Sequence, residues 1–325
     1  MNTYTLTKKV LAIFSFMTAT SIASAQSYPD RAITLVVPNP PGGLVDTSAR
    51  LLSEPLTRVI GQTVVVDNKP GASGNIAYQY VANAKPDGYT LLISYSGYHV
   101  GNPALMDKLP WDPVKDFSPI ALLTVSTNVI AVHPSVPVNN LKEFIAYAKA
   151  NPGKLNYASQ GNGSVSHIGT EMFKQTTGID MVHVPYKGSG PAIQDVLAGQ
   201  VQVFISTPPS VMQHVQSGKL KGLAVTGKNR HPGMPNVPTT AEAGLPSFQL
   251  ESWVALFAPA GTPAPIVTKL TDSVKKSLAL PEVKERADSA GVELRYLTPA
   301  HTEALVKKEL PYWSKVIKSA NITLD

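Results

Sequence analysis

The sequence predicts an α/β protein of two lobes, each a mixed sheet flanked by helices, with two strands that cross between the lobes. Three observations support this fold class. Short β-branched runs alternate with helical patterns near the start of the chain, the same alternation returns between residues 155 and 227, and two long apolar segments separate and follow these regions. Alternation of strands and helices is typical of parallel α/β sheets.

The first region contains three predicted strands, Ala32–Pro38, Thr63–Asn68 and Thr90–Ser96, which are rich in β-branched and apolar residues and are bounded by Pro, Gly and Asp. A helix is predicted over Asp46–Ile60, because apolar residues recur there at helical spacing and a glycine follows as a stop. A second helix is predicted over Asn75–Ala84. The order strand, helix, strand, helix, strand indicates a parallel layout.

The second region repeats this design without repeating its residues. Leu155–Gly178 has the pattern of a strand, a glycine loop and a helix, and Met181–Ser206 has that of a strand, a glycine loop, a helix and a strand. Leu220–Gly227 adds another predicted strand. The apolar segments Ser118–Pro134 and Phe248–Gly261 are interpreted as the strands that cross from one lobe to the other and back.

The end of the chain is predicted to be mostly helical, most clearly over residues 266–278 and 301–318. Because the chain returns after Phe248, the first lobe is predicted to be discontinuous. It comprises residues 26–125 and 250–325, and residues 126–249 form the second lobe. A ligand cleft is expected between the lobes, where the carboxyl ends of parallel strands and their loops face each other.

The first residues have the layout of a secretory signal peptide. Lys8 and Lys9 precede a short apolar run, and the small residues Ala23, Ser24 and Ala25 follow it, so cleavage is expected near Ala25–Gln26. The chain has no cysteine, which excludes disulfides, cysteine chemistry and a lipid-bearing cysteine at the cleavage site. The sequence therefore predicts a monomeric protein of the periplasm that is not a lipoprotein.

The charge of the chain is modestly positive, with a formal value of +6. Its basic residues are spread along the sequence and form no dense stripe with interleaved aromatic residues. Nucleic-acid binding is therefore not expected. A weak positive field favours small anions instead.

Three loops that follow predicted strands are rich in glycine: Pro41–Gly43, Gly161–Ser164 and Gly188–Gly190. The first N–H groups of a helix have no internal partner, and the helix dipole adds positive charge, so such loops hold carboxylate or phosphate groups. The nucleotide motifs GxxxxGK[ST] and GxGxxG are absent. An anion-binding cleft without a nucleotide or other cofactor is the prediction.

Catalytic candidates are few. Ser164 and His167 are compatible with a serine hydrolase, but also with a hydroxyl and an imidazole that donate hydrogen bonds to a carboxylate. His167 and Glu171 have the spacing of two metal ligands on one helix, yet no third ligand is indicated, so no metal is expected. Neither GxSxG nor HExxH is present.

Tyrosines lie near two of the predicted strand ends. Tyr95 and Tyr98 flank Gly97, and Tyr186 has the corresponding position in the second lobe. Each either faces the cleft or packs half-buried beside it. The neighbouring Lys187 is either a charge partner for the ligand or a solvated lysine.

Several stretches together resemble one family, the periplasmic solute receptors of tripartite tricarboxylate transporters, called TctC or Bug proteins. They are YPDRAITLVVPNPPGGLVD, VVDNKPGASGNIAYQYVANAKPDGYTLL, NYASQGNGSVSHIGTEMFK, HVPYKGSGPAIQDVLAGQVQVFI and MPNVPTTAEAGLP. The resemblance implies a type II periplasmic-binding-protein-like fold. It also implies reversible binding of a small carboxylate without catalysis, and delivery to membrane permease subunits.

The resemblance assigns ligand binding to the loop after the first strand and to glycine- and serine-rich loops of both lobes. The residues at these positions are Pro41, Gly42, Gly43, Leu44, Val45, Asp46, Ser94, Tyr95, Ser96, Gly97, Gly161, Asn162, Gly163, Ser164, His167, Tyr186, Lys187, Gly188, Ser206 and Thr207.

The chain departs from the family pattern where Leu44 and Val45 replace small or polar residues, and where Pro208 and Pro209 stiffen the segment after Thr207. Larger apolar walls favour an aromatic mono- or dicarboxylate. An aliphatic di- or tricarboxylate such as citrate is the alternative, and in that case Leu44 and Val45 only pack beneath the loop. A periplasmic sensor subunit and a serine hydrolase are the other functions considered.

Overall fold

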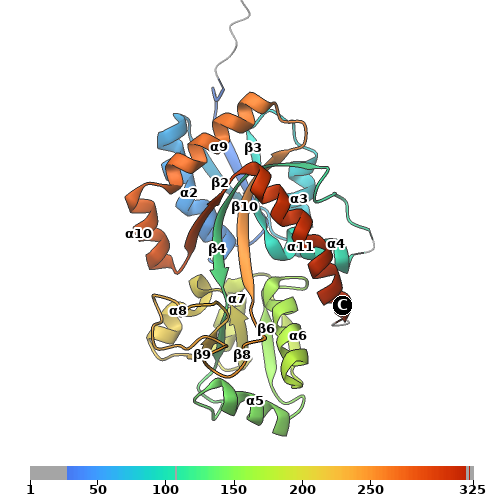
Figure 1. The fold of residues 1–325 in the computed structure, drawn as a ribbon, viewed down its shortest axis with the longest axis vertical. Helices are drawn as coiled ribbons and strands as arrows, with labels where there is room; N and C mark the ends of the chain where they lie inside the picture. Colours follow the sequence, from blue (N-terminus) through green and yellow to red (C-terminus); the bar gives the residue numbers. More distant parts are fainter. Residues whose placement is uncertain (1–27, 107, 320–321, 323–325) are drawn as a thin grey trace, which may run out of the picture.

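The computed structural model describes residues 28–106, 108–319 and 322. Two mixed sheets flanked by helices lie one above the other along the long axis of the molecule (Figure 1). The predicted fold class is therefore confirmed. The predicted signal peptide, residues 1–25, lies outside the described residues.

The first lobe holds a six-stranded sheet. Its N-terminal elements are β1 (Ile33–Val37), α2 (Leu44–Ile60), β2 (Val64–Asn68), the short turn η1 (Ala72–Gly74), α3 (Asn75–Ala82), β3 (Thr90–Tyr95), the π-helical turn η2 (Gly97–Gly101), α4 (Asn102–Leu105) and β4 (Phe117–Thr127). Its C-terminal elements are β10 (Glu251–Pro259), α9 (Ala264–Leu278), α10 (Pro281–Ala290), β11 (Glu293–Leu297) and α11 (Pro299–Ser319). The strand order is β11-β4-β10-β3-β1-β2.

The second lobe holds a five-stranded sheet in the order β7-β6-β8-β5-β9. Its elements are β5 (Val129–Val132), α5 (Leu141–Ala150), β6 (Asn156–Ser159), α6 (Val165–Thr177), β7 (Val182–Pro185), α7 (Ser189–Leu197), β8 (Val203–Ser206), α8 (Pro208–Gln216) and β9 (Lys221–Val225). Parallel pairs β6·β7 and β6·β8 place the loops before α6, α7 and α8 at one edge of the sheet, facing the first lobe.

The chain passes from the first lobe to the second at Asn128, the single residue between β4 and β5. Its backbone N–H donates to the Thr226 hydroxyl at 2.8 Å, and that hydroxyl donates to the Leu250 carbonyl at 2.6 Å. Leu250 directly precedes β10, so both crossing segments are tied to the same threonine. The lobe boundaries predicted at residues 125/126 and 249/250 remain predictions, but the sheets change at this point of the chain.

Several elements differ from the sequence prediction. Helix α2 begins at Leu44, two residues before the predicted start, and α5, α8, α10 and β11 were not predicted as separate elements. Pro208 and Pro209, expected to stiffen a segment after Thr207, open α8 instead. Proline is tolerated in the first turn of a helix because the N–H it lacks has no partner there.

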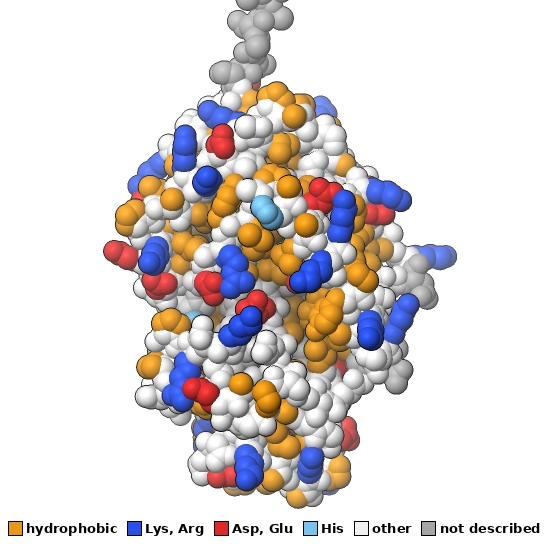
Figure 2. All heavy atoms as spheres, in the orientation of Figure 1, with side chains coloured by type: hydrophobic (Ala, Val, Ile, Leu, Met, Phe, Trp, Pro, Cys, Tyr) orange, Lys and Arg blue, Asp and Glu red, His pale blue; other side chains and the backbone are white. Residues whose placement is uncertain are grey.

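Within the part of the chain that the structure describes, no helix is both long enough and apolar enough to cross a membrane. On the face drawn in Figure 2, lysine and arginine side chains are interspersed with aspartate and glutamate. No dense basic stripe is present on that face.

Candidate functional site: the cleft between the lobes

Loops of the two lobes touch across the cleft at several points. A Cβ atom built on Gly43 would lie 2.8 Å from the Ser189 hydroxyl oxygen, and one built on Gly97 would lie 2.9 Å from the Val165 backbone nitrogen. The Ser73 hydroxyl donates to the Asn162 carbonyl oxygen at 2.8 Å. Each pair joins one residue of the first lobe to one of the second. The structure is therefore in a closed arrangement.

A cavity of about 400 Å³ lies between the lobes. The first lobe contributes residues 70–74 and the side chains of Pro38, Pro40 and Tyr98, and the second contributes Gln160, Gly161, Tyr186, Lys187 and Gly188. Lys187 carries the only formal charge among the described residues that line this cavity. The predicted positions Gly161, Tyr186, Lys187 and Gly188 are thus brought together with residues that sequence reasoning missed.

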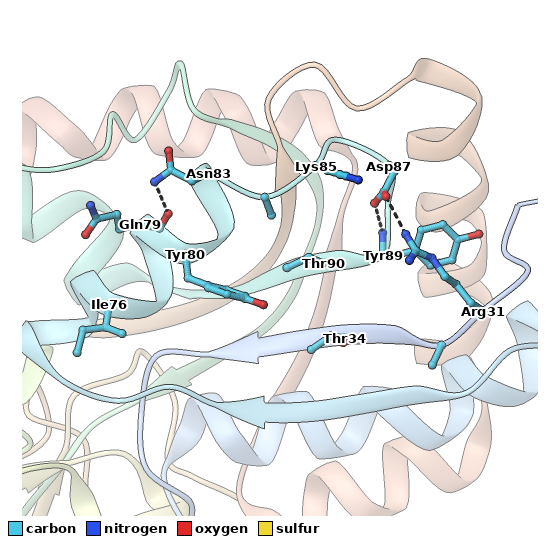
Figure 3. Close-up of a pocket in the computed structure, with 12 residues that line it drawn as sticks. Arg31, Thr34, Ile76, Gln79, Tyr80, Asn83, Lys85, Asp87, Tyr89 and Thr90 are labelled. Carbon is cyan, nitrogen blue, oxygen red and sulfur yellow. Dashed lines mark hydrogen bonds and ion pairs between the residues drawn. The ribbon is translucent and has the colours of Figure 1, made fainter.

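A larger hollow, of about 730 Å³, lies elsewhere (Figure 3). It is a groove on the outer side of the first lobe between α3 and strands β1 and β3, and its lining comes from that lobe alone. Arg31 and Asp87 at one end of the groove pair with each other at 2.8 Å. The interlobe cavity is a better candidate site than this groove, because loops that follow strands of both lobes meet in it.

The loop after β1 is shaped by Asp46. Its carboxylate accepts hydrogen bonds from the Gly42 backbone N–H at 3.1 Å, from Arg50 Nε at 3.0 Å and from Asn68 Nδ2 at 3.0 Å. The side chain is 5% exposed and its charge is paired with Arg50. Asp46 therefore holds the loop in place from behind, and its negative charge is compensated.

Leu44 and Val45 form the first turn of α2, and both are 3% exposed and belong to the hydrophobic core. Neither lines the interlobe cavity. The structure thus shows the packing alternative for these two side chains. Their backbone N–H groups lie in the first turn after the N-cap Gly43, where the N–H groups of a helix have no intrahelical partner.

The loop before α6 uses much of its own hydrogen-bonding capacity internally. Ser164 caps the helix: its hydroxyl donates to the Gly161 carbonyl at 2.7 Å and accepts from the His167 backbone N–H at 3.3 Å. The Gly163 N–H donates to His167 Nδ1 at 3.2 Å. Capping explains the proximity of Ser164 and His167 without a nucleophilic role.

The segment after β8 presents hydroxyl groups in place of backbone N–H groups, because the prolines that open α8 have none. Thr207 and Ser210 are 1% and 6% exposed, and their hydroxyl oxygens have no hydrogen-bond partner among the described residues. The neighbouring Ser206 hydroxyl accepts from Gln160 Nε2 at 3.1 Å. Buried polar atoms are rarely left unpaired, so these two hydroxyls are suited to a polar ligand.

The tyrosines divide into two groups. Tyr95 is 2% exposed and packs edge-on against Tyr98, with ring centroids 5.3 Å apart. Tyr98 and Tyr186 line the cavity. Burial raises the pKa of Tyr98 to about 12, partly offset by the hydrogen bond from Asn39. Burial, with the adjacent Asp195, raises that of Tyr186 to about 12. Both phenols are therefore neutral at ordinary pH.

Two predicted serines are engaged inside the first lobe. The Ser94 hydroxyl lies 2.9 Å from both the Tyr78 hydroxyl and His99 Nδ1, and the Ser96 hydroxyl accepts from the Trp253 backbone N–H at 3.1 Å. They support the end of β3 from within. Sequence reasoning also missed the loop at residues 70–74, although it follows β2 as the predicted loops follow their strands, and its glycines were a usable signal.

Two α/β lobes that close through strand-end loops on a largely uncharged cavity define a solute-binding receptor. The comparisons with known proteins specify the kind. Residues 48–322 match the family model described as tripartite tricarboxylate transporter family receptor. The chain belongs to this TctC/Bug family of periplasmic receptors, which is a family of binding proteins and not of enzymes.

Individual relatives agree. Protein BugT of Bordetella pertussis is 35% identical over 323 residues, covering 98% of this chain and 99% of that protein. Two solved structures are similar in fold. R. palustris Rpa4515 with adipate is 38% identical with a TM-score of 0.88, and the match covers 91% of this chain and 99% of the other. MatC from Rhodopseudomonas palustris with bound malate is 37% identical with a TM-score of 0.84, and the match covers 89% of this chain and 100% of the other.

Proposed function

We propose that this receptor captures an aromatic mono- or dicarboxylate in the interlobe cleft and delivers it to the membrane permease of a tripartite tricarboxylate-type transporter. The observation that carries the proposal is the composition of the cavity. It combines the backbone of glycine-rich loops, at residues 70–74, Gly161 and Gly188, with walls of tyrosine and proline, and Lys187 carries its only charge among the described lining residues.

The polar end of the ligand is served by neutral donors. The first turns of α2 and α7 face the cleft from opposite lobes, and helix starts bind carboxylates through free N–H groups and the helix dipole. Closure removes water from these donors, which strengthens each hydrogen bond to a charged group. A carboxylate that bridges the two lobes therefore favours the closed arrangement.

The hydrocarbon body of the ligand would face the rings of tyrosine and proline side chains. Tyr98 and Tyr186 contribute aromatic surface, and Pro38, Pro40 and Pro70 contribute flat apolar surface. A planar hydrocarbon ring buries more area against such walls than a short flexible chain does, and it loses less conformational entropy on binding. Because Leu44 and Val45 lie in the core, the case for an aromatic ligand rests on these five residues.

The alternative is an aliphatic di- or tricarboxylate. Two receptors of similar sequence were solved with adipate and with malate, and the helix-start donors described above do not distinguish an aliphatic from an aromatic carboxylate. Size and flatness of the ligand body decide between the alternatives.

A thermal-shift panel tests the proposal with benzoate, terephthalate, adipate, malate and citrate. A ligand at one hundred times its Kd stabilises the folded protein by about 2.7 kcal/mol, which is readily detected as a rise in Tm. We expect terephthalate or benzoate to give the largest rise. If only the aliphatic acids raise Tm, the aromatic assignment is wrong. Uptake of the same ligand by cells with and without this receptor tests delivery, and unchanged uptake without it would contradict the transport role.

A further inference from the structure

Two histidines lie behind the glycine loop that precedes α6. His167 Nδ1 accepts the Gly163 backbone N–H at 3.2 Å. His183 Nε2 lies 2.6 Å from the Ser159 hydroxyl oxygen, which accepts the Gly161 backbone N–H at 3.2 Å. Each histidine is thus connected, directly or through one hydroxyl, to a glycine N–H of the same loop.

These two bonds fix the loop in an unusual backbone conformation. Gly161 and Gly163 have φ angles of +124° and +77°, values that L side chains rarely adopt. With both N–H groups turned inward, the loop edge formed by Asn162 and the first turn of α6 faces the first lobe. The Asn162 carbonyl accepts the Ser73 hydroxyl there at 2.8 Å. The histidines therefore act on a segment that takes part in closure.

The two imidazole rings are stacked almost in parallel. Their centroids are 4.1 Å apart with an interplanar angle of 5°, and the Tyr157 ring also stacks with His183, at 4.8 Å. The three rings come from α6, β7 and β6. Two imidazolium ions in this geometry would repel each other, so the stack accommodates at most one proton readily.

Burial and the nearby ammonium group of Lys174 favour a neutral ring at His183. Lys174 lies over the Tyr157 ring at 5.7 Å and is paired with Glu171 at 2.9 Å, and Asp180 is 4.0 Å from the same ammonium group. Burial, with His167 and Lys174 adding to it, lowers the pKa of His183 to about 3. The His183 ring is therefore neutral above pH 4.

Because Nδ1 of His167 is an acceptor, the ring is neutral in this arrangement. A protonated ring has a hydrogen on both nitrogens and no acceptor to offer. Protonation would set two N–H groups against each other at Gly163. The loop would then have to move away from the helix start that it now supports.

We propose that His167 is a positioning residue: its neutral imidazole holds the Gly163 N–H and so keeps the ligand loop in its binding form, and protonation releases the loop and lowers affinity for the ligand. This rests on the proposed carboxylate-binding function. The direction of the change in affinity with pH distinguishes this role from direct contact, because a cationic His167 that contacted the carboxylate would raise the affinity on acidification.

The test is the Kd for terephthalate and for adipate, measured by calorimetry from pH 8 to 6, where both acids stay largely ionised. For the unaltered protein, Kd is expected to rise by up to about tenfold per pH unit once His167 begins to take up a proton, as linkage to one proton requires. A flat profile, or an affinity that increases in acid, would overturn the proposal.

Two variants separate positioning from mere packing. His167→Asn keeps an acceptor for Gly163 but does not titrate, so it is expected to bind at pH 8 within about threefold of the unaltered protein and to lose the acid dependence. His167→Phe keeps the stack but has no acceptor, so it is expected to bind weakly at every pH. If the Asn variant retains the original pH profile, His167 is not the group responsible.

A second measurement needs no ligand. In the unliganded protein, the amide signals of Gly161 and Gly163 in ¹⁵N spectra are expected to shift together with the titration of the His167 ring, and to be insensitive to pH in His167→Asn. Amide signals that do not follow the ring would overturn the proposal. If none of the acids binds but the amides follow the ring, the proposed ligand class is wrong while the positioning role stands.

Discussion

The contact between Gly43 and Ser189 offers a sharp test of closure, through the substitution Gly43→Ala. Gly43 has φ −108° and ψ −179°, which alanine adopts without strain, so the effect of the change is steric. The added Cβ would lie 2.8 Å from the Ser189 hydroxyl oxygen but 3.7 Å from its Cβ. Only the hydroxyl is in the way, and it belongs to the opposite lobe.

The magnitude follows from that distance. An overpacked contact costs about 1 to 3 kcal/mol, which corresponds to a rise in Kd of roughly 5- to 140-fold. The lower value corresponds to rotation of the Ser189 hydroxyl and the upper to incomplete closure. Because the contact joins the lobes, the Tm of the unliganded protein is expected to change little.

The assay is calorimetric titration with the best ligand of the panel. Ser189→Ala removes the obstructing oxygen, so the double variant Gly43→Ala/Ser189→Ala is expected to recover most of the lost affinity. Gly190→Ala is the matched control, because a Cβ there meets nothing within 4 Å. An unchanged Kd for Gly43→Ala, or no recovery in the double variant, would refute the steric reasoning.

Two further predictions follow from single contacts. Ser73→Ala removes the interlobe hydrogen bond to Asn162, so Kd is expected to rise by roughly 2- to 13-fold, the equivalent of about 0.5 to 1.5 kcal/mol, with little change in the unliganded Tm; an unaltered Kd would show that this bond does not contribute to closure. Burial lowers the pKa of His99 to about 4. Below pH 6.5 the unfolded chain therefore binds a proton at this residue that the folded protein does not bind. The stability that is present above pH 6.5 is lost as the pH falls toward 4, and His99 accounts for about 3 kcal/mol of that loss. Denaturant unfolding at pH 7 and pH 4.5 measures this, and His99→Gln is expected to show a smaller loss; an equal loss in the variant would assign the effect to other groups.

Local patterns predicted the elements of the fold where the signal is contained in a few neighbouring residues. The strands near Ile33, Val64 and Thr90 and the glycine stop of α2 were all visible in this way. Helix α8 was missed because Pro208 and Pro209 suggested a rigid loop. The same residues are equally compatible with a first helical turn, and only the packing of the following residues on the sheet decides between the two.

The candidate site was predictable in outline and not in detail. The glycine loops were identified from the sequence, but the start of α2 was placed two residues late. Leu44 and Val45 were considered for the ligand wall because they are bulky and apolar where the family has small or polar residues, with packing beneath the loop as the alternative; their side chains lie in the core. Asp46 is occupied by Asn68, a partner 22 residues away, which no local pattern indicates.

The sequence by itself predicted an α/β fold with an anion-binding cleft, because strand and helix patterns and the glycine loops at strand ends depend only on residues close together in the chain. Its resemblance to the TctC family then implied a receptor. The tertiary structure decided which donors of those loops already have partners within the protein. Ser189 opposite Gly43, and His183 stacked on His167, are brought together from different elements. Whether an N–H group is free to bind a carboxylate depends on the partners that folding places beside it, and long-range packing alone sets those partners.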